Sequence, residues 1–170
     1  FQKVLELKNV PRKGWQNKLK IENVESVSDH SYSVAVMSMI LSDIQGLDTE
    51  KIIKMALLHD LAESVVGDIT PNEIKNEKKI SMENQAMKQI LDNLPDNISR
   101  QYNLLWDNFQ NNSSVEATLL HEIDKLEMAF QAKFYLDNGI SKDKLRSFFK
   151  TANNEIKNKQ LRDILSIILE

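Results

Sequence analysis

The sequence predicts an all-α fold, a helical bundle of the single-domain kind that extends over residues 1–170. Only four glycines and three prolines interrupt the chain, and no segment alternates apolar and polar residues for long enough to indicate a β-strand. Hydrophobic residues make up 41% of the 170 residues and charged residues 28%. This composition is ordinary for a folded globular protein, and the length is sufficient to bury one sizeable core.

Helix-capping and helix-breaking residues divide the first half of the chain into three expected helices. Serine and aspartate favour the N-cap position, whereas glycine and proline favour the end of a helix. The expected segments are residues 3–8, ending near Pro11; residues from Ser28 and Asp29 to about Gly46; and residues 50–65, between Thr49 and Gly67.

The same signals predict four helical regions in the second half. They are residues 71–93, opened by Pro71; residues 96–109, after Pro95; residues from the loop at 111–114 to a C-cap at 137–139; and residues from Ser141 onward, broken once between 153 and 158. The last apolar positions, Leu161, Ile164, Leu165, Ile168 and Leu169, form a broad stripe. We expect the C-terminal helices 141–170 either to pack on the chain's own core or to form an oligomer.

Composition excludes several classes of protein. The chain has no cysteine, which excludes disulfides, zinc fingers and thiol nucleophiles. No apolar run approaches the roughly 18–20 residues that span a bilayer, and the first residues do not resemble a signal peptide, so a cytoplasmic protein is expected. The net charge of −3 gives no overall attraction to nucleic-acid polymers. Local positive charge is concentrated at residues 12–20, which contain four basic residues and no acid.

The stretch MALLHDLAES at residues 55–64 places two polar side chains inside an apolar helical pattern. His59 and Asp60 follow four apolar residues and precede Leu61 and Ala62. An unpaired polar group in a protein interior costs about 1–3 kcal/mol, and an unpaired charge costs more. The pattern therefore predicts a partner that compensates both side chains.

Two polar residues on other expected helices fit the same requirement. Asp124 lies beside an apolar face, and His30 lies early in the second expected helix. Together with His59 and Asp60, they suit a divalent metal ion, which neutralises carboxylates and binds imidazole nitrogens. Taken singly, each has a simpler explanation: a core histidine bonded to a carbonyl, an aspartate in a salt bridge, or a histidine near a helix start. We expect no metal-binding role for His121.

Glu63 and Asp68 are candidate catalytic residues. Glu63 follows His59 by four residues, which in a continuous helix places both on one face. A carboxylate one turn from a metal-bound histidine can accept a proton from metal-bound water. The alternative is an exposed glutamate at a helix end. Asp68 would ordinarily cap the next helix, but it is close enough in the chain to reach the same cavity.

Five motifs carry a resemblance to a known family. They are PRKGW at 11–15, ESVSDHSY at 25–32, LLHDLAE at 57–63, GDITP at 67–71 and DKLE at 124–127. In this order and spacing they resemble the HD-domain metal-dependent phosphohydrolases, in the HD domain-containing protein 2 branch related to the bacterial 5′-deoxynucleotidases. The signature residues lie within 11–127, and the resemblance implies a helical bundle of the HD-domain type.

The resemblance also implies a metal site and a substrate pocket. One divalent ion would be held by His30, His59, Asp60 and Asp124. Manganese, cobalt or magnesium would suit these ligands, and iron is a further candidate. Glu63 and Asp68 would lie beside it, where they serve the attacking water and the substrate or hold a second cation. Arg12 and Trp15 match the residues that line the nucleotide pocket, and Lys18 can help Arg12 to offset phosphate charge. For Trp15, a position in the core or at an interface is the alternative.

The expected function is that of a metal-dependent 5′-nucleotidase, a phosphomonoesterase that hydrolyses deoxyribonucleoside 5′-monophosphates to deoxyribonucleoside and phosphate. One alternative is a phosphodiesterase or pyrophosphohydrolase that acts on another nucleotide. Another is a metal-stabilised nucleotide-sensing module without turnover. The family resemblance further implies a homodimer, with a small-molecule nucleotide as the only other partner and no membrane association.

Overall fold

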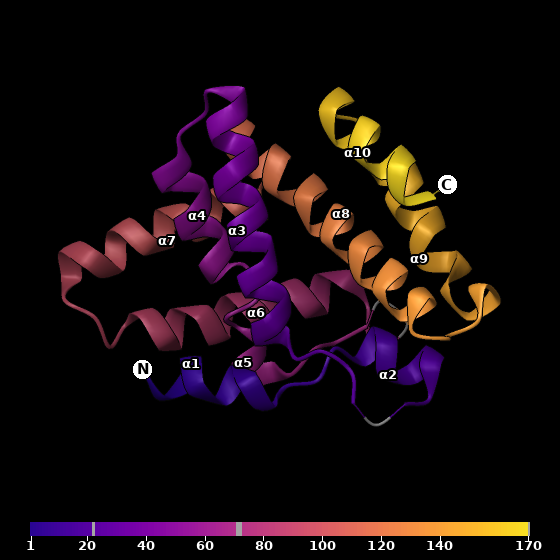
Figure 1. The fold of residues 1–170 in the computed structure, drawn as a ribbon. Helices are drawn as coiled ribbons and strands as arrows, with labels where there is room; N and C mark the ends of the chain where they lie inside the picture. Colours follow the sequence, from indigo (N-terminus) through magenta and orange to yellow (C-terminus); the bar gives the residue numbers. More distant parts are fainter. Residues whose placement is uncertain (22, 71–72, 170) are drawn as a thin grey trace.

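A computed structural model describes residues 1–21, 23–70 and 73–169, and these residues form an all-α bundle (Figure 1). The helices are α1 (Gln2–Glu6), the 3₁₀ helix η1 (Leu7–Asn9), α2 (Lys13–Leu19), α3 (Val27–Gln45), α4 (Thr49–Leu58), α5 (Glu63–Val66), α6 (Asn76–Leu91), α7 (Asp96–Gln110), α8 (Val115–Asp137), α9 (Lys142–Glu155) and α10 (Lys159–Leu169). The only β-type pairing among them is an isolated bridge between Pro11 and Ser26. The all-α prediction is therefore confirmed.

Helix α8 lies at the centre of the bundle, with α3 crossing it on one side and α9 and α10 on the other (Figure 1). Its buried residues are distributed around the helix rather than along one stripe, as expected for a helix covered on several sides. Leu120, Ile123 and Leu126 are completely buried in the main core. A residue on α8 can therefore reach both the α3–α4 layer and the C-terminal layer.

Helix α3 begins at Val27, slightly before the expected start at Ser28 and Asp29. Its N-cap is Ser26, whose side-chain oxygen accepts a hydrogen bond from the Asp29 backbone N–H at 3.1 Å. The Asp29 carboxylate accepts from the Ser26 backbone N–H at 2.9 Å, which completes a capping box. This cap fixes the first turn of α3, where His30 lies.

The third expected helix is not continuous from 50 to 65, and this part of the prediction was wrong. Helix α4 ends at Leu58, and α5 begins at Glu63. His59 Nδ1 lies 2.6 Å from the Ala56 carbonyl oxygen, an acceptor that a regular helix would use for a backbone N–H. Beyond this point the backbone bonds span three residues, including Glu63 N–H to the Asp60 carbonyl at 3.0 Å. The turn is therefore tighter than an α-helix.

Two other expectations about the N-terminal half need correction. The basic segment at 12–20 forms helix α2, which the sequence pattern did not reveal. Its backbone N–H at Lys13 donates to the Asp68 carboxylate at 2.7 Å, so a residue far along the chain stabilises the start of this short helix. The expected helix start at Pro71 lies outside the described residues, and α6 begins at Asn76.

The C-terminal helices pack on the chain's own core. The predicted break falls at residues 156–158, between α9 and α10. Of the apolar stripe on α10, Leu161 and Leu165 are at most 1% exposed and belong to the main core. Most of the stripe thus packs on the chain's own core, whereas Leu169 is 40% exposed, and the oligomer stays a prediction. No helix among the described residues combines the length and the hydropathy needed to cross a bilayer.

Candidate metal centre

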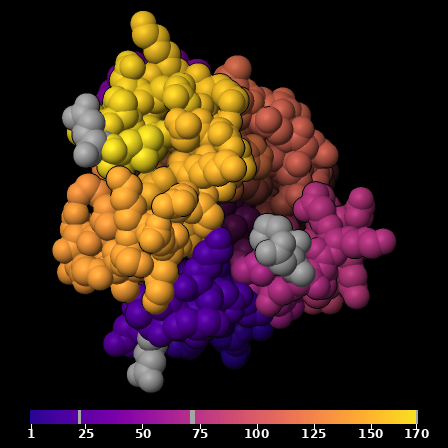
Figure 2. Space-filling model, turned by 90° about the vertical axis from the view of Figure 1, so that its right-hand side faces the viewer, coloured from indigo at the N-terminus to yellow at the C-terminus, as the bar shows by residue number. Residues whose placement is uncertain are grey.

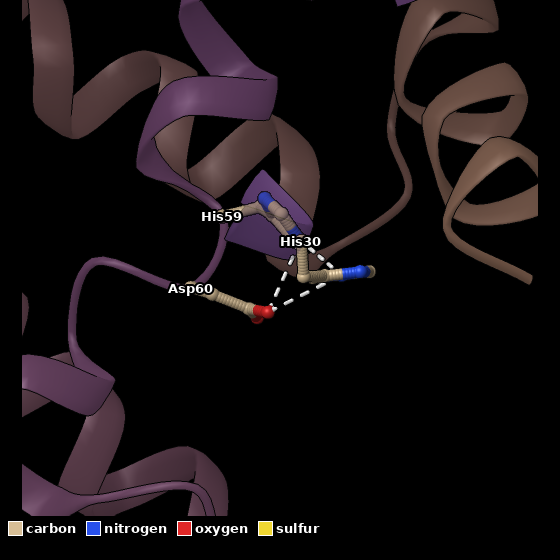
Figure 3. Close-up of side chains that lie close together, drawn as sticks. All are labelled: His30, His59 and Asp60. Atoms are coloured by element: carbon tan, nitrogen blue, oxygen red, sulfur yellow. Dashed lines mark hydrogen bonds and ion pairs between the residues drawn. The ribbon is translucent and has the colours of Figure 1, made fainter. Parts of the chain in front are cut away.

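Four side chains from three parts of the fold converge on one point. His30 projects from the first turn of α3, His59 and Asp60 from the tight turn after α4, and Asp124 from α8. His59 Nε2 lies 3.4 Å from His30 Nε2 and 3.2 Å from Asp60 Oδ2, and His30 Nε2 lies 3.1 Å from Asp124 Oδ1. Figure 3 shows the two imidazoles and the Asp60 carboxylate directed toward one another.

In each imidazole, the hydrogen bond made by Nδ1 determines whether the Nε2 atom that faces the cluster carries a proton. His30 Nδ1 lies 2.6 Å from Glu127 Oε2, and His59 Nδ1 lies 2.6 Å from the Ala56 carbonyl oxygen. Both partners are acceptors, so each Nδ1 carries the proton in the neutral ring. In the neutral rings each Nε2 then presents a lone pair to the other; His30 Nε2 also faces Asp60 and Asp124, and His59 Nε2 faces Asp60. An arrangement of four electron donors without a hydrogen between them fits a bound cation.

The titration behaviour of the cluster agrees with this fit. Burial and the charge of Arg12 lower the pKa of His30, but hydrogen bonds to Asp124 and Glu127 outweigh them and raise it to about 10. Burial raises the pKa of Asp124, whereas Lys125 and His30 hold it well below its ordinary value. The carboxylates thus stay ionised and attract positive charge, which a proton on His30 or a metal ion can supply.

Glu63 is close to the cluster, although not for the reason that the sequence suggested. The backbone hydrogen bonds in this turn join residues three apart, so the side chain of Glu63 lies on the same side of the turn as Asp60. In a regular α-helix it would have lain on the same side as His59. The side chain is buried, and its Oε2 atom has no hydrogen-bond partner. Burial, followed by the charges of Asp60 and Asp68, raises the pKa of Glu63 well above its ordinary value. A buried carboxylate oxygen without a protein partner retains unused capacity to accept a hydrogen bond from a water molecule or a ligand.

Arg12 and Asp68 border the cluster. Arg12 Nη1 lies 3.3 Å from Asp60 Oδ2, and its side chain is 18% exposed, as are those of Asp60 and Asp124. Asp68 is 8% exposed and accepts the Lys13 N–H described above. The space-filling view in Figure 2 shows a hollow where the indigo N-terminal segment, the magenta segment and the yellow and orange C-terminal helices meet. A guanidinium is therefore available at the solvent-exposed side of the cluster.

Trp15 and Lys18 are not brought to the cluster in the same way. Trp15 is 2% exposed and packs against Tyr135 and Phe148 in a second apolar core. Its indole N–H donates to Glu25 Oε1 at 2.7 Å, and Arg12 Nε lies 4.0 Å from the same oxygen. The geometry thus favours the alternative core position for Trp15.

Lys18 lies on a different surface. Its ammonium group is 2.5 Å from Ser147 Oγ and 5.3 Å from the centre of the Phe148 ring. It lines a cavity of about 400 Å³ beside α9, together with residues 143, 144, 146, 147 and 150. The Lys18 ammonium group is thus directed to Ser147 and Phe148 rather than to the histidine–aspartate cluster.

Sequence analysis assigned no role to three residues that surround the cluster. Glu127 bonds to His30, Lys125 Nζ lies 2.8 Å from Asp124 Oδ2, and Glu25 contacts Arg12 and Trp15. Their positions in the ESVSDHSY and DKLE motifs were the only signal available. His121 is half-buried and makes other contacts: its Nε2 lies 2.9 Å from the Phe109 carbonyl oxygen, and its ring stacks on Phe109.

The fold and the histidine–aspartate cluster together define a class of helical metal-binding domain. A sequence model described as the HD domain matches residues 4–164, and the chain belongs to this family. Human 5′-deoxynucleotidase HDDC2 is 36% identical over 162 residues, which cover 95% of this chain and 78% of that protein. The protein of the same name from Dictyostelium discoideum is 39% identical over 163 residues, covering 88% of this chain and 84% of that protein.

Solved structures show the same architecture. The PH0347 protein from Pyrococcus horikoshii OT3 superposes with a TM-score of 0.81 at 31% sequence identity, covering 98% of this chain and 95% of that one. The HD-domain fold that the motifs indicated is thereby confirmed across nearly the full length of the chain.

Proposed function

We propose that this protein is a metal-dependent 5′-deoxynucleotidase that releases phosphate from deoxyribonucleoside 5′-monophosphates. Two relatives that bear the name 5′-deoxynucleotidase, from human and Dictyostelium discoideum, are 36% and 39% identical and match 95% and 88% of the chain. The residues of the cluster are those that a metal-assisted phosphohydrolase requires: ligands, a buried carboxylate and a nearby guanidinium.

The observation that carries the proposal is the facing pair of imidazole nitrogens. The two Nε2 atoms, 3.4 Å apart and flanked by Asp60 and Asp124, repel one another unless a positive charge, either a proton on His30 or a metal ion, lies between them. We assign His30, His59, Asp60 and Asp124 as the ligands of one divalent ion. When bound, this ion polarises the phosphoryl group and lowers the pKa of a water molecule.

Glu63 is assigned as the group that orients the attacking water and accepts its proton. Its unpartnered Oε2 atom lies in a buried position adjacent to Asp60. Burial and the charges of Asp60 and Asp68 raise the pKa of its carboxyl group in the protein alone, and positive charge at the cluster would lower that pKa and favour the ionised form that accepts a proton. Asp68 holds the start of α2 through Lys13 N–H and is the second candidate for this role.

Arg12 is assigned to the phosphate. Its guanidinium already contacts the Asp60 carboxylate at 3.3 Å, so a phosphate at the cluster lies within reach of the same group. A guanidinium can contact two phosphate oxygens simultaneously. Lys18 is removed from this part of the proposal because its ammonium group is occupied at Ser147.

The remaining expectations stay predictions. We propose that residues 1–170 form a single HD domain, which the family match over 4–164 supports. Manganese, cobalt and magnesium are the metals that we would test first, because mixed imidazole and carboxylate ligands do not discriminate sharply among them. The homodimer and the cytoplasmic location are further predictions.

A phosphate-release assay tests the proposed activity. The purified protein, treated with a chelator and supplemented with MnCl₂, CoCl₂ or MgCl₂, is given a panel of deoxyribonucleoside and ribonucleoside 5′-monophosphates. We expect metal-dependent phosphate release with a preference for deoxyribonucleotides, loss of activity in His59→Ala, and retained activity in the control His121→Ala. Hydrolysis of diesters or nucleoside triphosphates, with none of monophosphates, would support the phosphodiesterase or pyrophosphohydrolase alternative instead. No turnover of any nucleotide would support the sensing module.

A further inference from the structure

One turn of α8 contacts both nitrogens of a single imidazole. Asp124 and Glu127 are three residues apart on α8 and so lie on the same face of the helix. Asp124 Oδ1 lies 3.1 Å from His30 Nε2, and Glu127 Oε2 lies 2.6 Å from His30 Nδ1. The His30 side chain is 0% exposed and that of Glu127 is 5% exposed, so this contact is shielded from water.

We propose that Glu127 is a positioning residue for the metal centre, acting through His30. The inference rests on the proposed function, because it requires that His30 is a metal ligand. The Glu127 carboxylate accepts a hydrogen bond from Nδ1–H, which keeps the proton on Nδ1, leaves the Nε2 lone pair directed at the cluster and holds the plane of the ring. A nearby negative charge also makes the imidazole a stronger donor to a cation.

The surroundings of Glu127 explain why this role needs a carboxylate. Ligand atoms of Glu25, His30 and Glu127 lie within 4.8 Å of one another, so two acidic groups face this edge of the ring. Glu25 is already engaged by the Trp15 indole N–H and the Arg12 guanidinium. Glu127, at hydrogen-bonding distance, is left to hold His30. A glutamine of the same shape can present its amide N–H to Nδ1 and so permit the wrong tautomer.

A purely structural role makes a different prediction. If Glu127 contributed only to stability, as a buried polar group between α3 and α8, its loss would lower the melting temperature equally with and without metal. A positioning role changes the affinity for the metal itself. The two roles are therefore separated by a binding measurement on folded protein at a fixed temperature.

The experiment compares Glu127→Gln with the matched control Glu116→Gln. Glu116 lies on the same helix, its side chain is 11% exposed against 5% for Glu127, and it pairs with Lys51 at 2.9 Å. It is eleven residues away, roughly 16 Å along the helix axis. Isothermal titration calorimetry with MnCl₂ on chelator-treated protein gives the dissociation constants, and the visible spectrum of the cobalt-loaded protein reports the ligand geometry.

We expect Glu127→Gln to weaken manganese binding by about 10- to 100-fold and to alter the cobalt spectrum, whereas Glu116→Gln leaves both unchanged. Glu127→Gln with wild-type affinity and spectrum would overturn the inference. If that variant does not fold, Glu127→Asp takes its place: it keeps the charge but shortens the reach to His30 Nδ1, and unchanged affinity would again refute the role. Wild-type protein that binds no manganese would instead contradict the proposed metal site itself.

Discussion

Replacing Glu63 by glutamine should separate catalysis from stability. The substitution keeps the shape of the side chain but removes its basicity. If Glu63 accepts the proton of the attacking water, turnover should fall by about 10²–10⁴, which corresponds to a barrier higher by about 2.7–5.5 kcal/mol. Binding of the metal should persist, because the four assigned ligands are unchanged.

The same substitution should increase the stability of the metal-free protein, although it lowers turnover. In the metal-free protein Glu63 is buried, its Oε2 atom has no partner, and its pKa is raised by burial and by Asp60 and Asp68. A carboxyl group whose pKa is higher in the folded state destabilises that state at neutral pH. A neutral amide avoids the charge repulsion. Each 1 kcal/mol gained should raise the melting temperature by about 2–4 °C in a domain of this size.

Two measurements on the same preparation check this prediction. Steady-state phosphate release, with metal content determined in parallel, gives turnover per bound ion. Thermal unfolding in the presence of a chelator gives the stability. A Glu63→Gln protein with full metal content and wild-type turnover would remove Glu63 from the mechanism and make Asp68 the next candidate base. A large loss of stability would show that Glu63 has a structural partner in solution.

Other predictions concern the metal, the phosphate and pH. Asp124→Ala should abolish the rise in melting temperature that manganese gives the chelated protein, whereas His121→Ala should retain it, as differential scanning fluorimetry will show. Arg12→Ala should raise the Michaelis constant for nucleoside monophosphates without changing metal content. Trp15→Phe keeps the packing but removes the bond to Glu25, and should raise the same constant less than Arg12→Ala. The pKa of His30 is raised from 6.5 to about 10, so protonation of His30 stabilises the metal-free fold. The free energy of unfolding in urea should hold this full contribution below about pH 6.5 and lose it as the pH rises toward 10.

The sequence was sufficient to predict the helical class and most helix positions. Glycine, proline and capping residues mark the ends of α3, α7, α8 and the break before α10, because these signals act within a few residues of the chain. The four ligand candidates could also be named, since polar residues on apolar helix faces need a partner. The contacts of 3.1–3.6 Å that join His30 to the other three, and His59 to Asp60, could not be derived from spacing alone.

The features that sequence analysis missed depend on contacts between distant residues. Helix α2 is stabilised at its start by Asp68, fifty-five residues later. Trp15 is buried by Tyr135 and Phe148, which come from α8 and α9. The helix break at His59 arises because an imidazole nitrogen takes the Ala56 carbonyl. Helix propensities and capping signals act between neighbouring residues and do not encode these contacts. Predictions based on such signals therefore missed helix α2 and the helix break at His59, and left the burial of Trp15 open.

The position of the metal is the central claim, and anomalous diffraction tests it most directly. Crystals grown with MnCl₂ should show an anomalous difference peak bonded to the Nε2 atoms of His30 and His59 and to carboxylate oxygens of Asp60 and Asp124. The His30 Nδ1 atom should remain hydrogen-bonded to Glu127. A fully occupied manganese held elsewhere, for example between Glu25 and Glu127, with the two Nε2 atoms unliganded, would contradict the account.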